Sequence, residues 1–387
     1  MAIDPTATRT RGRRAFLTNL AVLPAAALLA CGAREADGKD REATPGLAST
    51  ATAASTSTSS SRATPSANAD YFPPPTGDWE HTDLKAAGWS AAGIDRLVSF
   101  VKENKTATFM VVTGGRIVTE NYFPGVELFA DVSPGTPHDV ASVQKSVAST
   151  LLGIAQDKGL LKIDDPVSKY LAPGWSNAST ADEARITIRH LMTHSSGLSP
   201  RTLQKVADPG TVYDYNTDAY QKTRPLLEQA TATDINTLSR RWIFDTIGVS
   251  TAAKWAPRPT ADQDATGAAI WGLALTARDM ARFGIVSLHR GSWIDRRIVQ
   301  AAWYDEAWKP SRLKADYGLL WWLMGRRDIR NAPDDWVAAL GAMDQKIYVF
   351  PGYDTVVTRQ GIAAKEESEN TSDFDRTLFQ ALAAARA

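Results

Sequence analysis

Serine and lysine stand three residues apart at three places in this chain of 387 residues, and one of the three lies in a setting that suits chemistry. The pairs are Ser99/Lys102, Ser142/Lys145 and Ser311/Lys314. The first falls on the polar side of an amphipathic segment, and the third follows Lys309-Pro310 in a predicted loop. Ser142 instead opens a run of small and apolar residues with few charges, from 142 to 155. This run predicts a buried helix with a lysine near its start.

A buried Ser142 and Lys145 could carry out nucleophilic catalysis. A serine hydroxyl attacks poorly until a neighbouring base takes its proton. Residues i and i+3 share a helix face, and burial favours the neutral amine of lysine. The start of a helix also leaves backbone N–H groups free to stabilise an oxyanion. The alternative is a capping serine followed by a lysine that reaches solvent, and both interpretations stay open on these residues alone.

The helices and strands that would position Ser142 and Lys145 are predicted near both ends of the chain. Ser90 is a predicted N-cap for an amphipathic helix over residues 90–104, and two β-rich runs around Gly114-Gly115 predict a hairpin over 106–122. Three strands and a closing helix are predicted near the C-terminus, over residues 336–340, 346–350, 355–358 and 374–385. The stretch between, residues 140–300, is mostly helical in pattern. We therefore expect an α+β fold, in which an antiparallel sheet built from both chain ends is flanked by helices and a helical region is inserted in the middle.

Four blocks of sequence resemble, in the expected order, the serine β-lactamase and penicillin-binding-protein superfamily in its class C and esterase branch. The blocks are Ser142-Val-Gln-Lys145-Ser146 with Gly159–Val167, then Ile186–Leu198, Gly272–Gly284 and Tyr317–Trp322. Together they cover roughly residues 80–360. The resemblance implies the β-lactamase/transpeptidase-like fold, Ser142 as the nucleophile and Lys145 as its basic partner. No cofactor is expected.

The resemblance also implies a third catalytic residue, in a Tyr-x-Asn motif after the second block. The local sequence is Gly210-Thr211-Val212-Tyr213-Asp214-Tyr215-Asn216-Thr217. Alignment on Gly210-Thr211 puts Tyr215 at the tyrosine position and Thr217 where asparagine is usual. A tyrosinate could form there only if a cation lowers its pKa from about 10, and Lys145 is the candidate. Tyr215 would then accept the Ser142 proton and later activate water; the alternative is a loop aromatic that only packs.

One motif of the branch is missing. The β-lactamases and D-Ala-D-Ala peptidases carry Lys-Thr-Gly or His-Thr-Gly on a strand beside the site, where the cation helps to hold a substrate carboxylate. The closest equivalent here is Ala339-Leu340-Gly341-Ala342. Gly341 still permits close backbone approach, so the N–H groups of Ala342 and Ser142 could form an oxyanion hole. The lost charge argues against β-lactams and peptidoglycan and favours the esterase and 6-aminohexanoate-dimer (nylon oligomer) hydrolase branch.

Composition and the remaining motifs argue against other classes of protein. Lys plus Arg and Asp plus Glu both number 43, so no basic field favours a nucleic-acid partner. The single cysteine, Cys31, rules out intrachain disulfides and cysteine-rich zinc modules. His190 and His194 have a spacing that can bind a metal on a helix, but no Glu occupies the metalloprotease position, and no metal is expected. The chain has no Gly-x-Ser-x-Gly nucleophile elbow.

The N-terminal segment is predicted to be a targeting signal and not part of the folded domain. Residues 1–31 resemble a twin-arginine lipoprotein signal peptide, with Arg13-Arg14-x-Phe16-Leu17, an apolar stretch and the lipobox-like Leu28-Leu29-Ala30-Cys31. Residues 32–72, rich in Ala, Ser, Thr and Pro, predict a disordered linker, and residues 73–387 the hydrolase domain. An acylated Cys31 would anchor that domain to a membrane without spanning it. We expect an exported lipoprotein of the bacterial cell envelope; the alternative is a plain secretory peptide with an incidental cysteine.

The leading hypothesis for function is a serine hydrolase that forms an acyl-enzyme on Ser142 from a small ester or amide. One alternative is a β-lactamase or D-Ala-D-Ala carboxypeptidase. The other is a non-catalytic envelope protein that keeps the fold to bind a ligand. Retention of Ser142, Lys145 and Tyr215 together argues against a binding protein, since binding requires none of them. A small molecule is the expected partner in each case.

Overall fold

The computed structural model describes residues 70–259, 262–323, 335–364 and 373–386. The predicted signal peptide, Cys31 and the predicted linker up to residue 69 lie outside these ranges. Tyr71 and Phe72 fall inside the predicted linker but are packed: the Phe72 and Trp293 ring centroids are 5.1 Å apart, and the Tyr71 hydroxyl accepts from the Glu80 N–H. The packed part therefore begins before residue 73, because two aromatic side chains find partners there. Among the described residues, none of the helices has the length and apolarity that crossing a bilayer would require.

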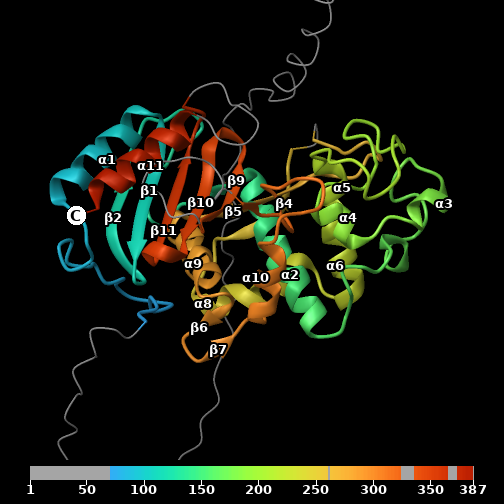
Figure 1. The fold of residues 1–387 in the computed structure, drawn as a ribbon, viewed down its shortest axis with the longest axis horizontal. Helices are drawn as coiled ribbons and strands as arrows, with labels where there is room; N and C mark the ends of the chain where they lie inside the picture. Colours follow the sequence, from blue (N-terminus) through green and yellow to red (C-terminus); the bar gives the residue numbers. More distant parts are fainter. Residues whose placement is uncertain (1–69, 260–261, 324–334, 365–372, 387) are drawn as a thin grey trace, which may run out of the picture. The chain divides into compact units, whose positions relative to one another are not determined.

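A six-stranded antiparallel sheet forms the centre of the described chain (Figure 1). Its order is β2 (Arg116–Tyr122), β1 (Thr106–Thr113), β11 (Thr355–Gly361), β10 (Gln345–Phe350), β9 (Val337–Gly341) and β8 (Trp322–Leu323). The predicted hairpin supplies β1 and β2, and the three predicted C-terminal strands supply β9 to β11. Strand β11 joins the two groups, because it pairs with β1 on one side and with β10 on the other. Every one of its residues is buried. The expected sheet built from both chain ends is confirmed.

Helices cover both faces of this sheet. They are α1 (Ala91–Glu103) and α11 (Asp373–Ala385) on one face, and α9 (Ala277–Leu288) and α2 (Gln144–Asp157) on the other. Successive strand residues point to opposite faces, so Val111 and Val357 join the buried cluster with α1 and α11, while Met110 and Val356 join the cluster with α9 and α2. Figure 1 shows α1 and α11 side by side, and Gly93 permits this contact because a Cβ there would lie 2.5 Å from the Ala385 Cα.

The middle of the chain forms the expected helical region, beside the sheet in Figure 1. Its further helices are α3 (Thr180–Glu183), α4 (Ile188–Met192), α5 (Thr217–Gln221), α6 (Thr223–Thr231), α7 (Ile235–Ser239), α8 (Asp245–Ile247) and α10 (Ala301–Ala307). The sequence analysis missed two small sheets in this region. They are a three-stranded sheet of β3 (His138–Asp139), β5 (Trp271–Leu275) and β4 (Lys254–Pro257), and a pair of β6 (Ser292–Trp293) and β7 (Arg296–Arg297). Strands of two to five residues are too short to give a clear alternation of polar and apolar side chains.

Gly153 sets how closely α2 and α10 approach. A Cβ at this position would lie 2.4 Å from the indole of Trp303, which is buried. Gly153→Val is expected to lower the free energy of unfolding by about 1 to 3 kcal/mol, because the indole has no room to move away. Chemical denaturation measures this difference. Gly135→Ala is the control, since a Cβ there would meet nothing within 4 Å, and equal stability of Gly153→Val and the wild type would contradict the close packing.

Candidate active site

Ser142 lies in a single 3-10 turn, Ala141–Val143, that leads directly into α2. The sequence predicts Ser142 on the first turn of a helix, whereas the structure places it in the 3-10 turn just before that helix. The turn keeps the i, i+3 relation: the Lys145 Nζ donates to the Ser142 Oγ over 2.8 Å. Ala141, the residue before the nucleophile, has a left-handed backbone with φ of 49°, and its N–H donates to the Asp139 Oδ1 over 2.7 Å. A side chain therefore holds the turn that presents Ser142.

Lys145 is buried, with 2 % of its surface exposed, and its amine faces hydroxyls and aromatic rings. Its Nζ lies 3.4 Å from the Thr217 Oγ1, and 5.0 and 4.6 Å from the ring centroids of Tyr215 and Tyr220. Within the described ranges no carboxylate forms an ion pair with it. Burial lowers its pKa to about 7, with a further lowering by Arg258 and an opposing effect of Asp218. A large share of this amine is therefore neutral near pH 7 and able to accept a proton.

The loop that carries Tyr215 and Thr217 is fixed by Asn216. The Asn216 Oδ1 accepts from the Ala219 N–H over 2.8 Å and so caps α5, while its Nδ2 donates to the Leu198 carbonyl over 2.9 Å. Because Thr217 is the first residue of α5, this cap sets where its hydroxyl lies. The structure thus brings Thr217, the residue at the expected asparagine position, next to Lys145.

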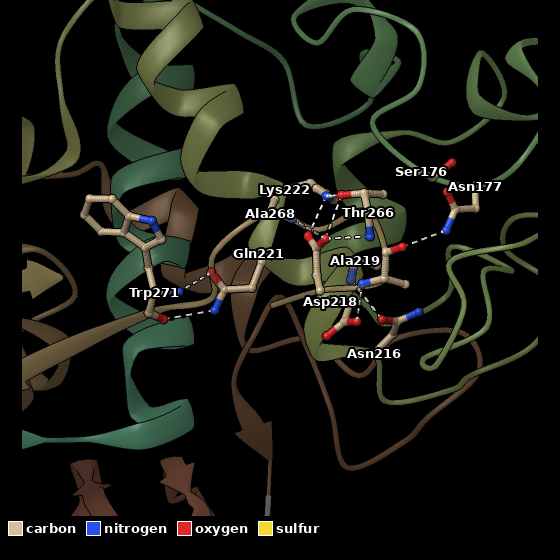
Figure 2. Close-up of polar contacts among 12 residues, drawn as sticks. Ser176, Asn177, Asn216, Asp218, Ala219, Gln221, Lys222, Thr266, Ala268 and Trp271 are labelled. Carbon is tan, nitrogen blue, oxygen red and sulfur yellow. Dashed lines mark hydrogen bonds and ion pairs between the residues drawn. The ribbon is translucent and has the colours of Figure 1, made fainter. Parts of the chain in front are cut away.

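Figure 2 shows how α5 and the residues after it are tied to the rest of the region. The Gln221 amide donates to the Trp271 carbonyl over 3.0 Å and accepts from the Trp271 N–H over 3.2 Å, as a neighbouring strand would. Lys222 is buried and pairs with the Asp264 carboxylate over 2.6 Å. The Asp218 carboxylate accepts from the Ala265 N–H over 3.3 Å. These contacts hold α5, which directly follows the Tyr215 loop, against strand β5 and the segment that precedes it.

Tyr215 and His194 pack ring against ring. Their centroids are 4.2 Å apart, and the Tyr215 ring also stacks on Trp322 at 6.1 Å. The Nδ1 of His194 accepts the Asn216 N–H over 3.2 Å, so its proton resides on Nε2, which donates to the Tyr317 hydroxyl over 3.1 Å. Burial, and then the charge of Lys145, hold the pKa of His194 well below its ordinary value. The ring is therefore neutral and serves to position the Tyr215 loop.

The two tyrosines of this loop, Tyr213 and Tyr215, have different neighbours. The Tyr213 ring lies 5.6 Å from the Lys314 Nζ, whereas the Tyr215 ring lies 5.0 Å from the Lys145 Nζ.

His190 uses its Nδ1 to accept the Thr187 N–H at the start of α4. In the parts of the chain that are described, no three His, Cys, Asp or Glu side chains are grouped as metal ligands would be.

Gly341, at the end of β9, lies against the 3-10 turn that carries the candidate nucleophile Ser142. A Cβ at this residue would lie 2.5 Å from the Val140 carbonyl oxygen and 3.0 Å from the Ser142 nitrogen. Any side chain would push the strand away from the turn. The structure therefore brings the backbone of Gly341 and Ala342 next to Ser142, as an oxyanion hole requires. Lys346, on the next strand, is paired with Asp344 and Asp375 inside the protein and supplies no cation at this edge.

Sequence reasoning missed four residues near Lys145. They are Asp139, Tyr220 and Arg258, together with Asp218, which follows Thr217 directly. Burial raises the pKa of Asp218, and the Lys145 charge opposes this. None of the four lies in the blocks that carried the resemblance, and no spacing in the sequence links Asp139 to Arg258. Only the position of Asp218 beside Thr217 was a usable signal.

A family model matches the part of the chain that contains this site. The beta-lactamase family profile matches residues 94–384, which include every catalytic candidate and the whole central sheet. The chain belongs to the beta-lactamase family. This membership agrees with the fold: a solved D-alanine carboxypeptidase from Burkholderia cenocepacia superposes with a TM-score of 0.56 at 16 % identity, covering 76 % of this chain and 98 % of that one.

Two further proteins are similar to this chain, one in sequence and one in structure. A 6-aminohexanoate-dimer hydrolase from Paenarthrobacter ureafaciens is 24 % identical over 304 residues, which is 67 % of this chain and 73 % of that protein. A solved Bacillus anthracis protein, provisionally assigned as a 6-aminohexanoate-dimer hydrolase, has a TM-score of 0.62 at 17 % identity and covers 81 % of this chain and 89 % of that one. The chain is thus a hydrolase of the beta-lactamase fold.

Proposed function

We propose that this hydrolase forms an acyl-enzyme on Ser142 and hydrolyses a small ester or a linear amide. The observation that carries the proposal is the buried Lys145 amine, which lies 2.8 Å from the Ser142 hydroxyl with its pKa lowered to about 7. A lysine kept for structure would be charged and paired with a carboxylate. A lysine kept neutral beside a hydroxyl is suited to accept its proton.

The proposed reaction has two halves. Neutral Lys145, in place of the tyrosinate that the sequence suggested, takes the proton of Ser142 as the Oγ bonds to the substrate carbonyl carbon, and the N–H groups of Ser142 and Ala342 stabilise the oxyanion. Collapse breaks the bond to the leaving alcohol or amine, which receives the proton through Lys145 and Tyr215. Water then attacks the ester, returns a proton to the same groups and releases a carboxylic acid with free Ser142. The overall reaction cleaves one ester or amide bond and consumes one water molecule.

The class of substrate follows from the missing cation. Strand β9 presents Ala339-Leu340-Gly341 where a carboxylate-binding lysine or histidine is expected, and Lys346 is neutralised by two carboxylates. This favours substrates without a carboxylate next to the scissile bond. The similarity to a 6-aminohexanoate-dimer hydrolase supports a linear amide. A β-lactamase or D-Ala-D-Ala carboxypeptidase is the second candidate, favoured by the family itself.

The test is the intact mass of the full chain after incubation with a fluorophosphonate, with the modified residue located by peptide mapping. One adduct on Ser142 is the expected result, and hydrolysis of p-nitrophenyl esters, linear oligoamides and a chromogenic cephalosporin then ranks the substrate classes. Faster turnover of the cephalosporin would favour the second candidate. A folded protein that takes up no adduct would contradict the proposal and leave the binding protein as the better description.

Tyr215→Phe is expected to lower ester hydrolysis by a factor of roughly 10² or more, because it removes a proton-transfer hydroxyl from the site. The ring contacts with His194 and Trp322 remain, so thermal stability should hardly change. Steady-state kinetics and a melting curve measure both. Tyr213→Phe is the matched control, since its ring lies beside Lys314. Wild-type rates in Tyr215→Phe would remove Tyr215 from the mechanism.

A further inference from the structure

The small three-stranded sheet brings together two charged residues from distant parts of the chain. Asp139 ends β3, and Arg258 directly follows β4. Both strands pair with β5, where Ala274 faces Asp139 on one side and Lys254 on the other. The Arg258 N–H continues this pairing by donating to the Ile270 carbonyl over 2.8 Å. The sheet therefore fixes the spacing between the two side chains.

Arg258 binds Asp139 through two parallel hydrogen bonds. The Nε donates to Oδ2 over 2.8 Å, and the second guanidinium nitrogen donates to Oδ1 over 3.1 Å. The pair lies over Gly272, where a Cβ would come within 2.6 Å of the Asp139 Oδ2 and 3.2 Å of the Arg258 Nε. Arginine matches the two oxygens of a carboxylate in a way that lysine cannot. Both side chains are partly exposed, so the pair contributes little to folding by itself.

The pair is linked to both members of the proposed catalytic dyad. The Asp139 Oδ1 that Arg258 holds also accepts the Ala141 N–H and so fixes the left-handed residue before Ser142. The Ser142 hydroxyl that this turn presents accepts from the Lys145 Nζ over 2.8 Å.

We propose that Arg258 and Asp139 are positioning residues for acylation: Arg258 holds the Asp139 carboxylate, and Asp139 holds the turn that presents the Ser142 hydroxyl to Lys145. The inference rests on the proposed function. It deepens that function, because it assigns the positioning of Ser142 to two residues outside the blocks that carry the resemblance.

The charges around Lys145 add an expected effect of Arg258 on the pKa of this amine. Arg258 is the positive group that lowers its pKa, after burial, and Asp218 on α5 is the negative group that raises it. His194 is neutral, and the other side chains facing the amine are the hydroxyl of Thr217 and the rings of Tyr215 and Tyr220. Removal of the Arg258 charge leaves Asp218 unopposed. The pKa of Lys145 must then rise.

The experiment follows the rate of fluorophosphonate addition to Ser142 as a function of pH, on the full chain. Wild type is expected to gain reactivity as pH rises through about 7. In Arg258→Met the plateau rate should fall, because Asp139 loses two hydrogen bonds, and the midpoint should move upward, because a positive charge that lowers the pKa of Lys145 is lost. Arg258→Lys keeps the charge, so its midpoint should stay near that of wild type while its plateau rate falls. Asp139→Asn should lower the plateau rate without an upward shift.

Arg278→Met is the matched control. Arg278 binds Glu120 through the same two-bond geometry, over 2.7 and 2.8 Å, but joins α9 to β2 away from Ser142. Its midpoint and plateau rate should equal those of wild type. A wild-type plateau rate in folded Arg258→Met or Asp139→Asn, or an equal loss of plateau rate in Arg278→Met, would overturn the inference. Should Arg258→Met fail to fold, a wild-type plateau rate in Asp139→Asn overturns it as well. Absence of any adduct on wild type would instead count against the proposed function.

Discussion

Ser142→Ala is expected to abolish turnover of the best substrate, with a fall in kcat of roughly 10⁴ or more. The change removes the atom that becomes acylated and leaves the rest of the site in place. Lys145 keeps its buried position and its contact with Thr217, so the fold should be unaffected. Steady-state kinetics, with a melting curve on the same sample, measure both effects.

The chain supplies its own matched controls for this change, since Ser99 and Ser311 stand in the same spacing to a lysine. The Ser99 Oγ donates to the Asp95 carbonyl on the exposed side of α1, and the Ser311 Oγ donates to the Lys314 carbonyl. Ser99→Ala and Ser311→Ala should both keep wild-type rates within about twofold, since neither hydroxyl faces a buried amine. Substantial activity in Ser142→Ala would mean that another nucleophile does the chemistry.

Lys145→Met is expected to reduce acylation of Ser142 by a factor of roughly 10³ or more, because it removes the base that accepts the hydroxyl proton. The same change should leave the free energy of unfolding unchanged or higher. A buried amine without a carboxylate partner is costly to desolvate, and methionine fills similar space without that cost. The wild-type rate should rise with pH through about 7, since the neutral form is the reactive one and its pKa is lowered to about 7.

Lys346→Met is the informative comparison, because Lys346 is equally buried but contacts Asp344 and Asp375 over 2.9 Å each. Loss of this amine leaves two carboxylates in the interior without it, which is expected to cost about 3 to 5 kcal/mol of stability. Turnover per folded molecule should be unchanged. The two lysines would thus respond in opposite ways. Full activity in Lys145→Met, or strong destabilisation by it, would show that Lys145 is structural.

The sequence by itself indicated which segments at both chain ends form the strands of one sheet, the buried helix α2 and the choice of Ser142 over Ser99 and Ser311 as the candidate nucleophile. These features depend on local patterns: the β-rich runs of β1 and β11, and the small number of charges in the run after Ser142. Such patterns are set within about ten residues, so they can be read before the chain folds.

Only the tertiary structure decided the charge state of Lys145 and the grouping of residues around it. The lowered pKa arises from burial and from Arg258, more than 100 residues away in the chain. The contact between Gly341 and the Ser142 turn, and the pairing of Asp139 with Arg258, depend on strands that meet only after folding. Strands of two to five residues leave no period in the sequence, and electrostatic effects depend on distance in space. For this reason the candidate nucleophile could be named from the sequence, whereas the residues that surround it could not.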